Sequence, residues 1–293
     1  MQLVTIGDSE LRVSQVGLGG NNFGRRLDLE GTRAVVDAAL DAGITFFDTA
    51  DIYGGGDSER FLGEVLQGRR DRVILATKFG MGDGGGSREY VHRAIGASLE
   101  RLQTDYVDLY YYRRPDGVTP IAETMLAIAE LVEAGTVRHI GISNVDGAQL
   151  AQAADAARIT AVQNSYSLLN RAPEAEVLPL ARELGIGFVP YFPLASGLLT
   201  GKYHKGEEPP PGSRLEGRDD RLADDALDRV ARLEQFASQQ GHSLLELAIG
   251  ALASEPGVAS VIAGATKPEQ VRANAAAGGW ELSAAERDAL RRV

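Results

Sequence analysis

Short apolar runs of strand length alternate eight times with longer segments of helical periodicity along this chain. The runs are enriched in Val, Ile, Phe and Tyr, which favour β-strands. The strands expected from them span residues 16–19, 45–48, 73–77, 107–112, 137–142, 161–164, 187–191 and 258–263. Strands that alternate with helices form a parallel sheet, and eight such units close most simply into a (β/α)8 TIM barrel of the α/β class.

The segments around these strands complete the expected fold. The expected helices span residues 29–42, 58–67, 89–102, 121–134, 145–157, 174–184, 225–240, 244–253 and 268–276. Residues 2–6 and 11–13 flank Gly7-Asp8 and predict an N-terminal β-hairpin. A stretch rich in Gly and Pro, about 193–223, predicts a long loop after the seventh strand. Since we find no internal repeat and no linker, we predict one barrel domain over residues 1–293.

A doubly wound open sheet is the competing fold. It binds a dinucleotide on a glycine-rich turn after its first strand, usually with the pattern GxGxxG. Residues 16–20 contain three glycines there, but they lack that pattern and an acidic residue placed to hold a ribose. The length of 293 residues also suits a single barrel, which typically needs about 250.

Composition excludes several classes of function. The net charge of −11 argues against nucleic acid and acidic membranes as partners. The chain has no cysteine, and none of its four histidines forms an HExxH pair, so we expect no metal site. No basic segment followed by an apolar run begins the chain, and no apolar stretch is long enough to span a membrane, so we expect a cytoplasmic protein. The oligomeric state stays open.

Three polar side chains fall where barrel strands end. Asp48 ends the second expected strand, Tyr53 follows in a glycine-rich loop, and Lys78 follows the third. The carboxyl ends of barrel strands meet at one rim, so these side chains should converge. An ammonium group favours the ionised form of a nearby phenol, and a carboxylate can hold that ammonium in place. Such a trio can protonate a carbonyl oxygen, although an Asp–Lys pair at this position can also be purely structural.

The segment from Asp48 to Glu59 carries a resemblance to a known family. It reads DTADIYGGGDSE, which is similar to the D-T-A-x-x-Y-G-x-G-x-S-E pattern of the aldo-keto reductases. The resemblance implies an NADP(H)-dependent oxidoreductase that reduces aldehyde or ketone carbonyls to alcohols. In that family Tyr53 would be the general acid, with Lys78 promoting its acidity and Asp48 anchoring Lys78.

Arg113 departs from this resemblance. The family usually carries a histidine after the fourth strand, whereas this chain reads Tyr112-Arg113-Arg114. Arginine is a fixed cation with a planar fork of donors, so Arg113 can contact the substrate oxygen or recruit an anionic substrate group. The replacement also motivates two alternatives: shifted chemistry, such as enone reduction or oxidation of a sugar or lactol, and a nicotinamide-binding regulatory protein with little turnover.

The resemblance further implies a cofactor site. Its parts are the strand ends, the loop after the seventh strand and the N-terminus of the last barrel helix. The cofactor-binding residues that it implies are Gly20, Asn21, Ser143, Asn144, Gln163, Tyr191, Leu194, Ser196, Gly197, Leu199, Gly201, Lys202, Gly264, Thr266, Lys267, Gln270 and Asn274. NADP(H) is favoured and NAD(H) is the alternative, because Gln270 stands where many relatives have an arginine while Lys267 can supply a positive charge.

Overall fold

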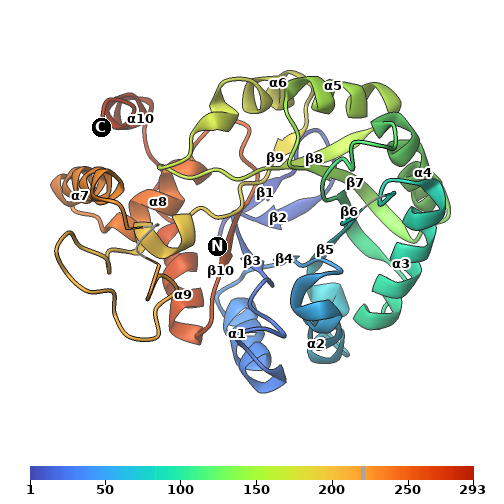
Figure 1. The fold of residues 1–293 in the computed structure, drawn as a ribbon, viewed down its shortest axis with the longest axis horizontal. Coiled ribbons are helices and arrows are strands. Elements are labelled where there is room, and N and C mark those ends of the chain that lie inside the picture. Colours follow the sequence, from blue (N-terminus) through green and yellow to red (C-terminus); the bar gives the residue numbers. More distant parts are fainter. Residues whose placement is uncertain (83, 219–221) are drawn as a thin grey trace.

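A parallel β-barrel ringed by helices forms the body of the computed structural model, which describes residues 1–82, 84–218 and 222–293 (Figure 1). Its strands are β3 (Val16–Gly19), β4 (Phe46–Asp48), β5 (Ile74–Phe79), β6 (Val107–Tyr112), β7 (Val137–Ser143), β8 (Ile159–Gln163), β9 (Gly187–Phe188) and β10 (Val261–Gly264). They pair in the order β10-β3-β4-β5-β6-β7-β8-β9, each pair parallel. Bridges of Phe188 with Val258 and of Tyr191 with Ile262 join the two ends of this sheet, which confirms the (β/α)8 fold.

The helices pack around the outside of the barrel. They are α1 (Leu29–Asp41), α2 (Asp57–Val65), α3 (Arg88–Leu102), α4 (Ile121–Glu133), α5 (Gly147–Ala156), α6 (Val177–Glu183), α7 (Asp224–Gln239), α8 (Leu244–Ala253), α9 (Pro268–Ala277) and α10 (Ala284–Leu290). Short 3-10 turns complete the set: η1 (Tyr53–Gly56), η2 (Arg70–Arg72), η3 (Ala172–Glu174) and η4 (Ala195–Thr200). The expected helix over residues 174–184 is divided into η3 and α6. Pro179 lies in the first turn of α6, where a missing N–H is tolerated.

An antiparallel hairpin of β1 (Leu3–Thr5) and β2 (Arg12–Ser14) covers the N-terminal end of the barrel, as the sequence predicted. It crosses the barrel centre in Figure 1. Ile6 and Val13 are fully buried among side chains that fill the barrel interior. The Ser14 backbone N–H donates to Thr45 Oγ1 at 3.0 Å, just before β4 begins. The hairpin therefore closes this end, and the polar strand ends lie at the other.

A second hydrophobic core lies outside the barrel. It joins the loop after β9 to α7, α8 and the C-terminal segment. Leu199 of η4 is fully buried there, beside Tyr203 and Leu247. The loop was predicted at 193–223, of which 219–221 lie outside the described residues, and apolar side chains such as Leu199 and Tyr203 anchor its described part in this core.

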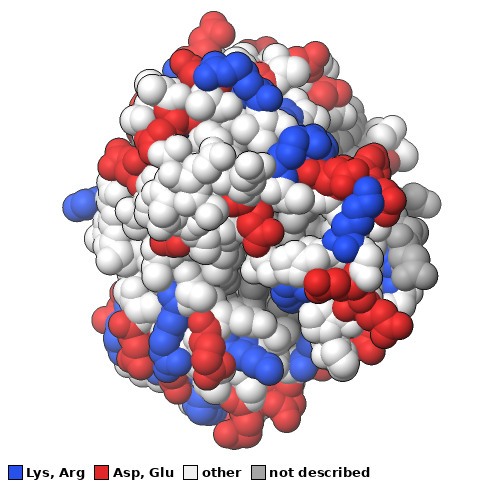
Figure 2. All heavy atoms as spheres, turned by 90° about the vertical axis from the view of Figure 1, so that its left-hand side faces the viewer, with Lys and Arg blue, Asp and Glu red and all other residues white. Residues whose placement is uncertain are grey.

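One face of the molecule carries charges of both signs. Acidic and basic side chains are interspersed among uncharged ones on the face drawn in Figure 2. Across the described ranges, no helix combines the length and apolar character that a membrane crossing requires.

Candidate active site

Asp48 and Lys78 form a buried ion pair at the carboxyl ends of β4 and β5. Lys78 Nζ donates to Asp48 Oδ1 at 2.5 Å and to the Thr49 carbonyl at 2.8 Å. Gln163, which ends β8, donates from Nε2 to Asp48 Oδ2 at 2.9 Å. The side chains of Asp48 and Lys78 are only 4% and 2% exposed. Both carboxylate oxygens are thus paired, which is the condition for keeping such charges away from water.

One strand boundary near the site differs from the sequence prediction. Lys78 lies within β5, because this strand continues to Phe79 instead of ending at residue 77. Gln163, expected among the cofactor-binding residues, donates its amide N–H to Asp48. Its amide therefore helps to fix the Asp48 carboxylate whether or not it also meets a cofactor.

Tyr53 begins η1, in a loop that brings it over this ion pair. Lys78 Nζ lies 5.5 Å from the centre of the Tyr53 ring. Gly54 has φ +61, and a Cβ there would lie 2.8 Å from the Phe23 carbonyl oxygen. Only glycine allows the loop after β4 to pack so closely on the loop after β3. The backbone of the glycine segment thus sets the position of the phenol.

Arg113 directly follows β6 and faces the same phenol. Its guanidinium carbon is 5.1 Å from the Tyr53 ring centre. Its backbone N–H donates to the Phe79 carbonyl at 2.9 Å, and its carbonyl accepts from Asn144 Nδ2 at 2.8 Å. Arg113 Nη1 is buried and lacks a hydrogen-bond partner among the residues described. Tyr53 therefore has two cationic groups within cation–π distance, Lys78 and Arg113.

Asp51 is a titratable residue of this region that the sequence analysis did not single out. Its backbone N–H donates to the Lys78 carbonyl at 3.0 Å, and its Oδ1 is buried without a partner in the described part of the chain. Burial, helped by the nearby Glu59 carboxylate, raises the pKa of Asp51 to about 6, although Arg101 and Arg113 oppose the shift. The only available signal was an acidic residue two positions before Tyr53.

Ser143, Asn144 and Tyr191 form a hydrogen-bonded chain at the ends of β7 and β9. Tyr191 donates its hydroxyl to Asn144 Oδ1 at 2.6 Å, and Asn144 Nδ2 donates to Ser143 Oγ at 3.0 Å. Burial raises the pKa of Tyr191. Asn144 has φ +57, a left-handed conformation that is uncommon outside glycine. The structure thus brings together three of the residues that the resemblance assigned to cofactor binding.

The loop after β9 has an unusual backbone at its start. Phe192, Ala195 and Ser196 adopt φ +56, +46 and +61, followed by Gly197 at +105. Non-glycine residues with positive φ are strained and gather at functional sites. Lys202 lies against Gly197, since a Cβ added to Gly197 would be 3.6 Å from Lys202 Nζ.

The other residues of this loop that were expected to bind the cofactor differ in burial and in backbone conformation. Leu194 is half-buried beside both hydrophobic cores, and Leu199 is fully buried in the second one. Gly201 ends η4 in a left-handed conformation, with φ +75. Leu199 therefore has only its backbone to offer a ligand.

The last group of expected cofactor-binding residues lies where β10 meets α9. Thr266 donates from its backbone N–H to Gln270 Oε1 at 2.8 Å, Lys267 is the exposed N-cap residue of α9, and Asn274 is buried. The side-chain oxygen of Gln270 thus accepts a hydrogen bond from Thr266, four residues earlier.

Gly20 and Asn21 lie at the neighbouring end of β3. A Cβ on Gly20 would lie 2.8 Å from Ser58 Oγ, so no side chain fits there. Asn21 Oδ1 is a buried acceptor with no partner among the described residues, and it faces Gly264 at the end of β10. A ligand with a hydrogen-bond donor would satisfy this atom.

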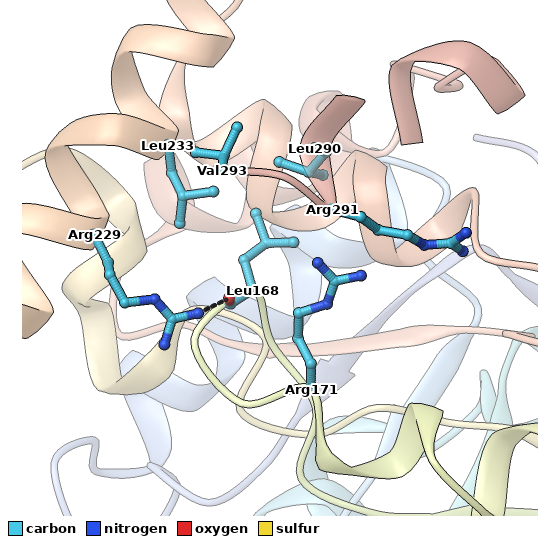
Figure 3. Close-up of a pocket in the computed structure, with 7 residues that line it drawn as sticks. All are labelled: Leu168, Arg171, Arg229, Leu233, Leu290, Arg291 and Val293. Carbon is cyan, nitrogen blue, oxygen red and sulfur yellow. Dashed lines mark hydrogen bonds between the residues drawn. The ribbon is translucent and has the colours of Figure 1, made fainter. Parts of the chain in front are cut away.

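A separate small cavity lies away from the strand ends. It has a volume of about 200 Å³ and is bounded by Leu168 and Arg171 before η3, by α7 and by the C-terminal segment (Figure 3). Arg171 pairs with Glu174, Arg229 donates to the Leu168 carbonyl, and Arg291 pairs with Glu255. These arginines are engaged with the protein, so we do not assign this cavity to the active site.

Comparisons with known proteins agree with this architecture. The model of the Aldo/keto reductase family matches residues 15–293. A probable voltage-gated potassium channel subunit beta of Oryza sativa subsp. japonica is 39% identical, over 94% of this chain and 90% of its own length. Aldo-keto reductase YhdN of Bacillus subtilis is 35% identical, over 97% and 90%. The holo form of aldo-keto reductase AKR11C1 from Bacillus halodurans covers all of this chain and 96% of its own, with TM-score 0.85 and 34% identity.

Proposed function

The chain belongs to the aldo/keto reductase family, and we propose that it reduces aldehyde or ketone carbonyls to alcohols with NADP(H) and with Tyr53 as the general acid. As a member of this family it is an NAD(P)H-dependent oxidoreductase. The observation that carries the finer proposal is the arrangement of a half-buried phenol between two cationic groups at the open end of the barrel.

In this mechanism Tyr53 gives its hydroxyl proton to the carbonyl oxygen. The nicotinamide cofactor, when bound, supplies the hydride. Lys78 stabilises the tyrosinate that forms, because its ammonium lies beside the ring and two hydrogen bonds hold it there. Asp48 keeps the buried ammonium charged and in place. Arg113 donates hydrogen bonds to the substrate oxygen, the task that the family usually gives to a histidine.

The residues at the barrel mouth fit a nicotinamide cofactor. The unpaired acceptor on Asn21 and the amide–hydroxyl chain from Ser143 to Tyr191 suit a carboxamide, which needs both donors and acceptors. The N-terminus of α9 suits a phosphate, since helix N-termini attract anions. Lys267 is exposed at that terminus and would favour the additional phosphate of NADP(H) over NAD(H).

The test compares Tyr53→Phe with the unaltered enzyme over a panel of aldehydes and ketones, with NADPH and NADH. Removing a general acid typically lowers the rate about 10²- to 10⁴-fold. Tyr106→Phe is the matched control, because Tyr106 lies before β6 at the opposite end of the barrel, beneath Arg70 and Arg138. A Tyr53→Phe enzyme that keeps more than a tenth of its activity on these substrates would exclude Tyr53 as the acid.

Two alternatives have specific support. The Oryza relative is named as a probable channel subunit, which favours the alternative of a regulatory protein for this chain. Tight NADPH binding without oxidation by any carbonyl would favour it. Arg113 in place of histidine supports shifted chemistry, so the panel includes enones for reduction and aldoses for oxidation. Turnover confined to enones or aldoses would replace the carbonyl reductase proposal.

A further inference from the structure

Arg113 has a buried N–H donor, at Nη1, with no acceptor in the described part of the chain, and the reduction of a simple carbonyl does not require this donor. The described carboxylates at the barrel mouth are engaged elsewhere or do not reach it: Asp48 pairs with Lys78, and Glu59 pairs with Arg101. A buried guanidinium N–H without an acceptor is costly, so such a group calls for a partner that arrives with the ligand.

Asp51 does not fill this role. It lies close enough for Arg113 to influence its titration, yet the two form no ion pair within 4.0 Å, and Asp51 Oδ1 is itself buried without a partner among the residues that the structure describes. Arg101 opposes the pKa shift of Asp51 more than Arg113 does. The buried Nη1 of Arg113 therefore has no acceptor among the described residues.

The position of Arg113 restricts where that acceptor can lie. Its guanidinium carbon is 5.1 Å from the Tyr53 ring centre, and its main chain is fixed by hydrogen bonds to Phe79 and Asn144. An oxygen that accepts the Tyr53 proton is thus a near neighbour of the Arg113 fork. The planar fork of arginine suits two oxygens at once, which a lysine or histidine does not.

We propose that Arg113 selects substrates in which a carboxylate is bonded directly to the reacting carbonyl carbon, that is, 2-oxo acids. This inference builds on the carbonyl reductase activity proposed above. In a 2-oxo acid the carbonyl oxygen and one carboxylate oxygen sit on adjacent carbons, so one guanidinium can donate to both while Tyr53 reaches the carbonyl oxygen. A phosphate ester needs intervening atoms between its anion and the carbonyl, which places the charge farther from this fork.

The reaction balances without a further reactant. The carbonyl carbon gains a hydride from the reduced nicotinamide, its oxygen gains the proton of Tyr53, and the product is a 2-hydroxy acid. The carboxylate and Arg113 keep their charges throughout. Arg113 contacts the substrate in both states, so it contributes to binding as well as to the orientation of the carbonyl.

The experiment measures kcat/KM for phenylglyoxylate and for its neutral methyl ester, which keeps an activated carbonyl. The unaltered enzyme should prefer the acid at least about tenfold. Arg113→Gln removes the donor to the carbonyl oxygen of both substrates, but only the acid also loses the partner of its carboxylate, so the loss on the acid should exceed the loss on the ester by about 10²- to 10³-fold, the range seen when one partner of a buried charge pair is removed. Arg113→Lys keeps the charge without the fork and should recover only part of the loss. Arg114→Gln, at an exposed neighbouring residue, is the matched control.

Binding separates this inference from the proposed activity. Oxamate, a 2-oxo acid analogue that is not reduced, is titrated into the enzyme–NADPH complex beside the neutral amide oxamide. Arg113-dependent binding of oxamate supports the anion site even if no carbonyl is turned over, in which case only the reductase proposal fails. Equal reduction of acid and ester, with no Arg113-dependent binding of oxamate, overturns the 2-oxo acid assignment and leaves the carbonyl reductase intact.

Discussion

Replacing Lys78 by methionine tests how the buried ion pair is stabilised. Lys78 and Asp48 are almost fully buried, and Lys78 donates its two hydrogen bonds to Asp48, the last residue of β4, and to the carbonyl of Thr49. In Lys78→Met, Asp48 keeps the amide of Gln163 on one oxygen and loses the ammonium on the other. Methionine is similar in length to the aliphatic part of lysine and can occupy the same space, so the main change is the loss of the ion pair.

The expected cost is large. Removing one partner of a buried ion pair typically destabilises a protein by about 3–5 kcal/mol, because the remaining charge is left uncompensated. In a chain of this size each kcal/mol lowers the melting temperature by about 2 °C, so the expected decrease is about 6–10 °C. Asp48→Asn combined with Lys78→Met removes both charges and should recover most of the loss.

The assay is urea unfolding followed by circular dichroism, at several pH values. A lone buried carboxylate relieves its cost by taking up a proton that the unfolded chain would release. The difference between Lys78→Met and the unaltered protein should therefore shrink as the pH falls from 8 toward 5. Arg88→Met is the control, because the Arg88–Glu130 pair is exposed and contributes little.

Two results would contradict this account. One is a Lys78→Met protein that loses less than about 1 kcal/mol, since a pair this deeply buried cannot be removed so cheaply. The other is a double variant as unstable as Lys78→Met alone, because the defect would then come from packing instead of the unpaired charge.

Two further predictions concern stability. Asp51→Asn should stabilise the fold by up to about 3 kcal/mol above pH 7 and progressively less toward pH 4. The reason is that burial raises the pKa of Asp51 to about 6, so its ionised form is disfavoured in the folded protein. Urea midpoints across this pH range measure the gain in stability, and a gain that does not vary with pH would contradict the prediction. Gly63→Ala should destabilise α2, since its Cβ would lie 2.6 Å from the Arg101 carbonyl oxygen, whereas Gly96→Ala in α3 meets nothing within 4 Å and should stabilise by about 0.5–1 kcal/mol; melting temperatures that move in the same direction would refute the pair.

The architecture could be predicted from sequence because its signals are local and repeated. Strand-length apolar runs alternating with helical segments leave few folds open, and the carboxyl ends of parallel strands bring Asp48 and Lys78 to one rim regardless of the details. Boundaries were less accurate. β9 is only Gly187–Phe188 where residues 187–191 were expected, since the chain beyond it keeps only isolated bridges.

The site contains features that no local pattern reveals. The Gln163–Asp48 hydrogen bond joins residues 115 positions apart and depends on the barrel closing. The burial of Asp51 depends on the surroundings that the folded chain gives it, which composition does not encode. Arg113 was recognised as a departure from the family pattern, but only the fold shows that its Nη1 lacks a partner within residues 1–82, 84–218 and 222–293. The roles of the cofactor residues stay predictions, because they depend on a ligand.

Because of the second hydrophobic core, the residues that anchor the loop after β9 are separate from those that position the reacting groups. The loop after β9 is anchored by Leu199 among α7, α8 and the C-terminal segment, whereas Asp48, Lys78 and Tyr53 are positioned by β4, β5 and the loop after β4. Substitutions among the helices of this outer core can loosen or tighten the loop without moving the reacting groups. Substitutions in this outer core can therefore change the residence time of a bound ligand while the reacting groups around Tyr53 stay unchanged.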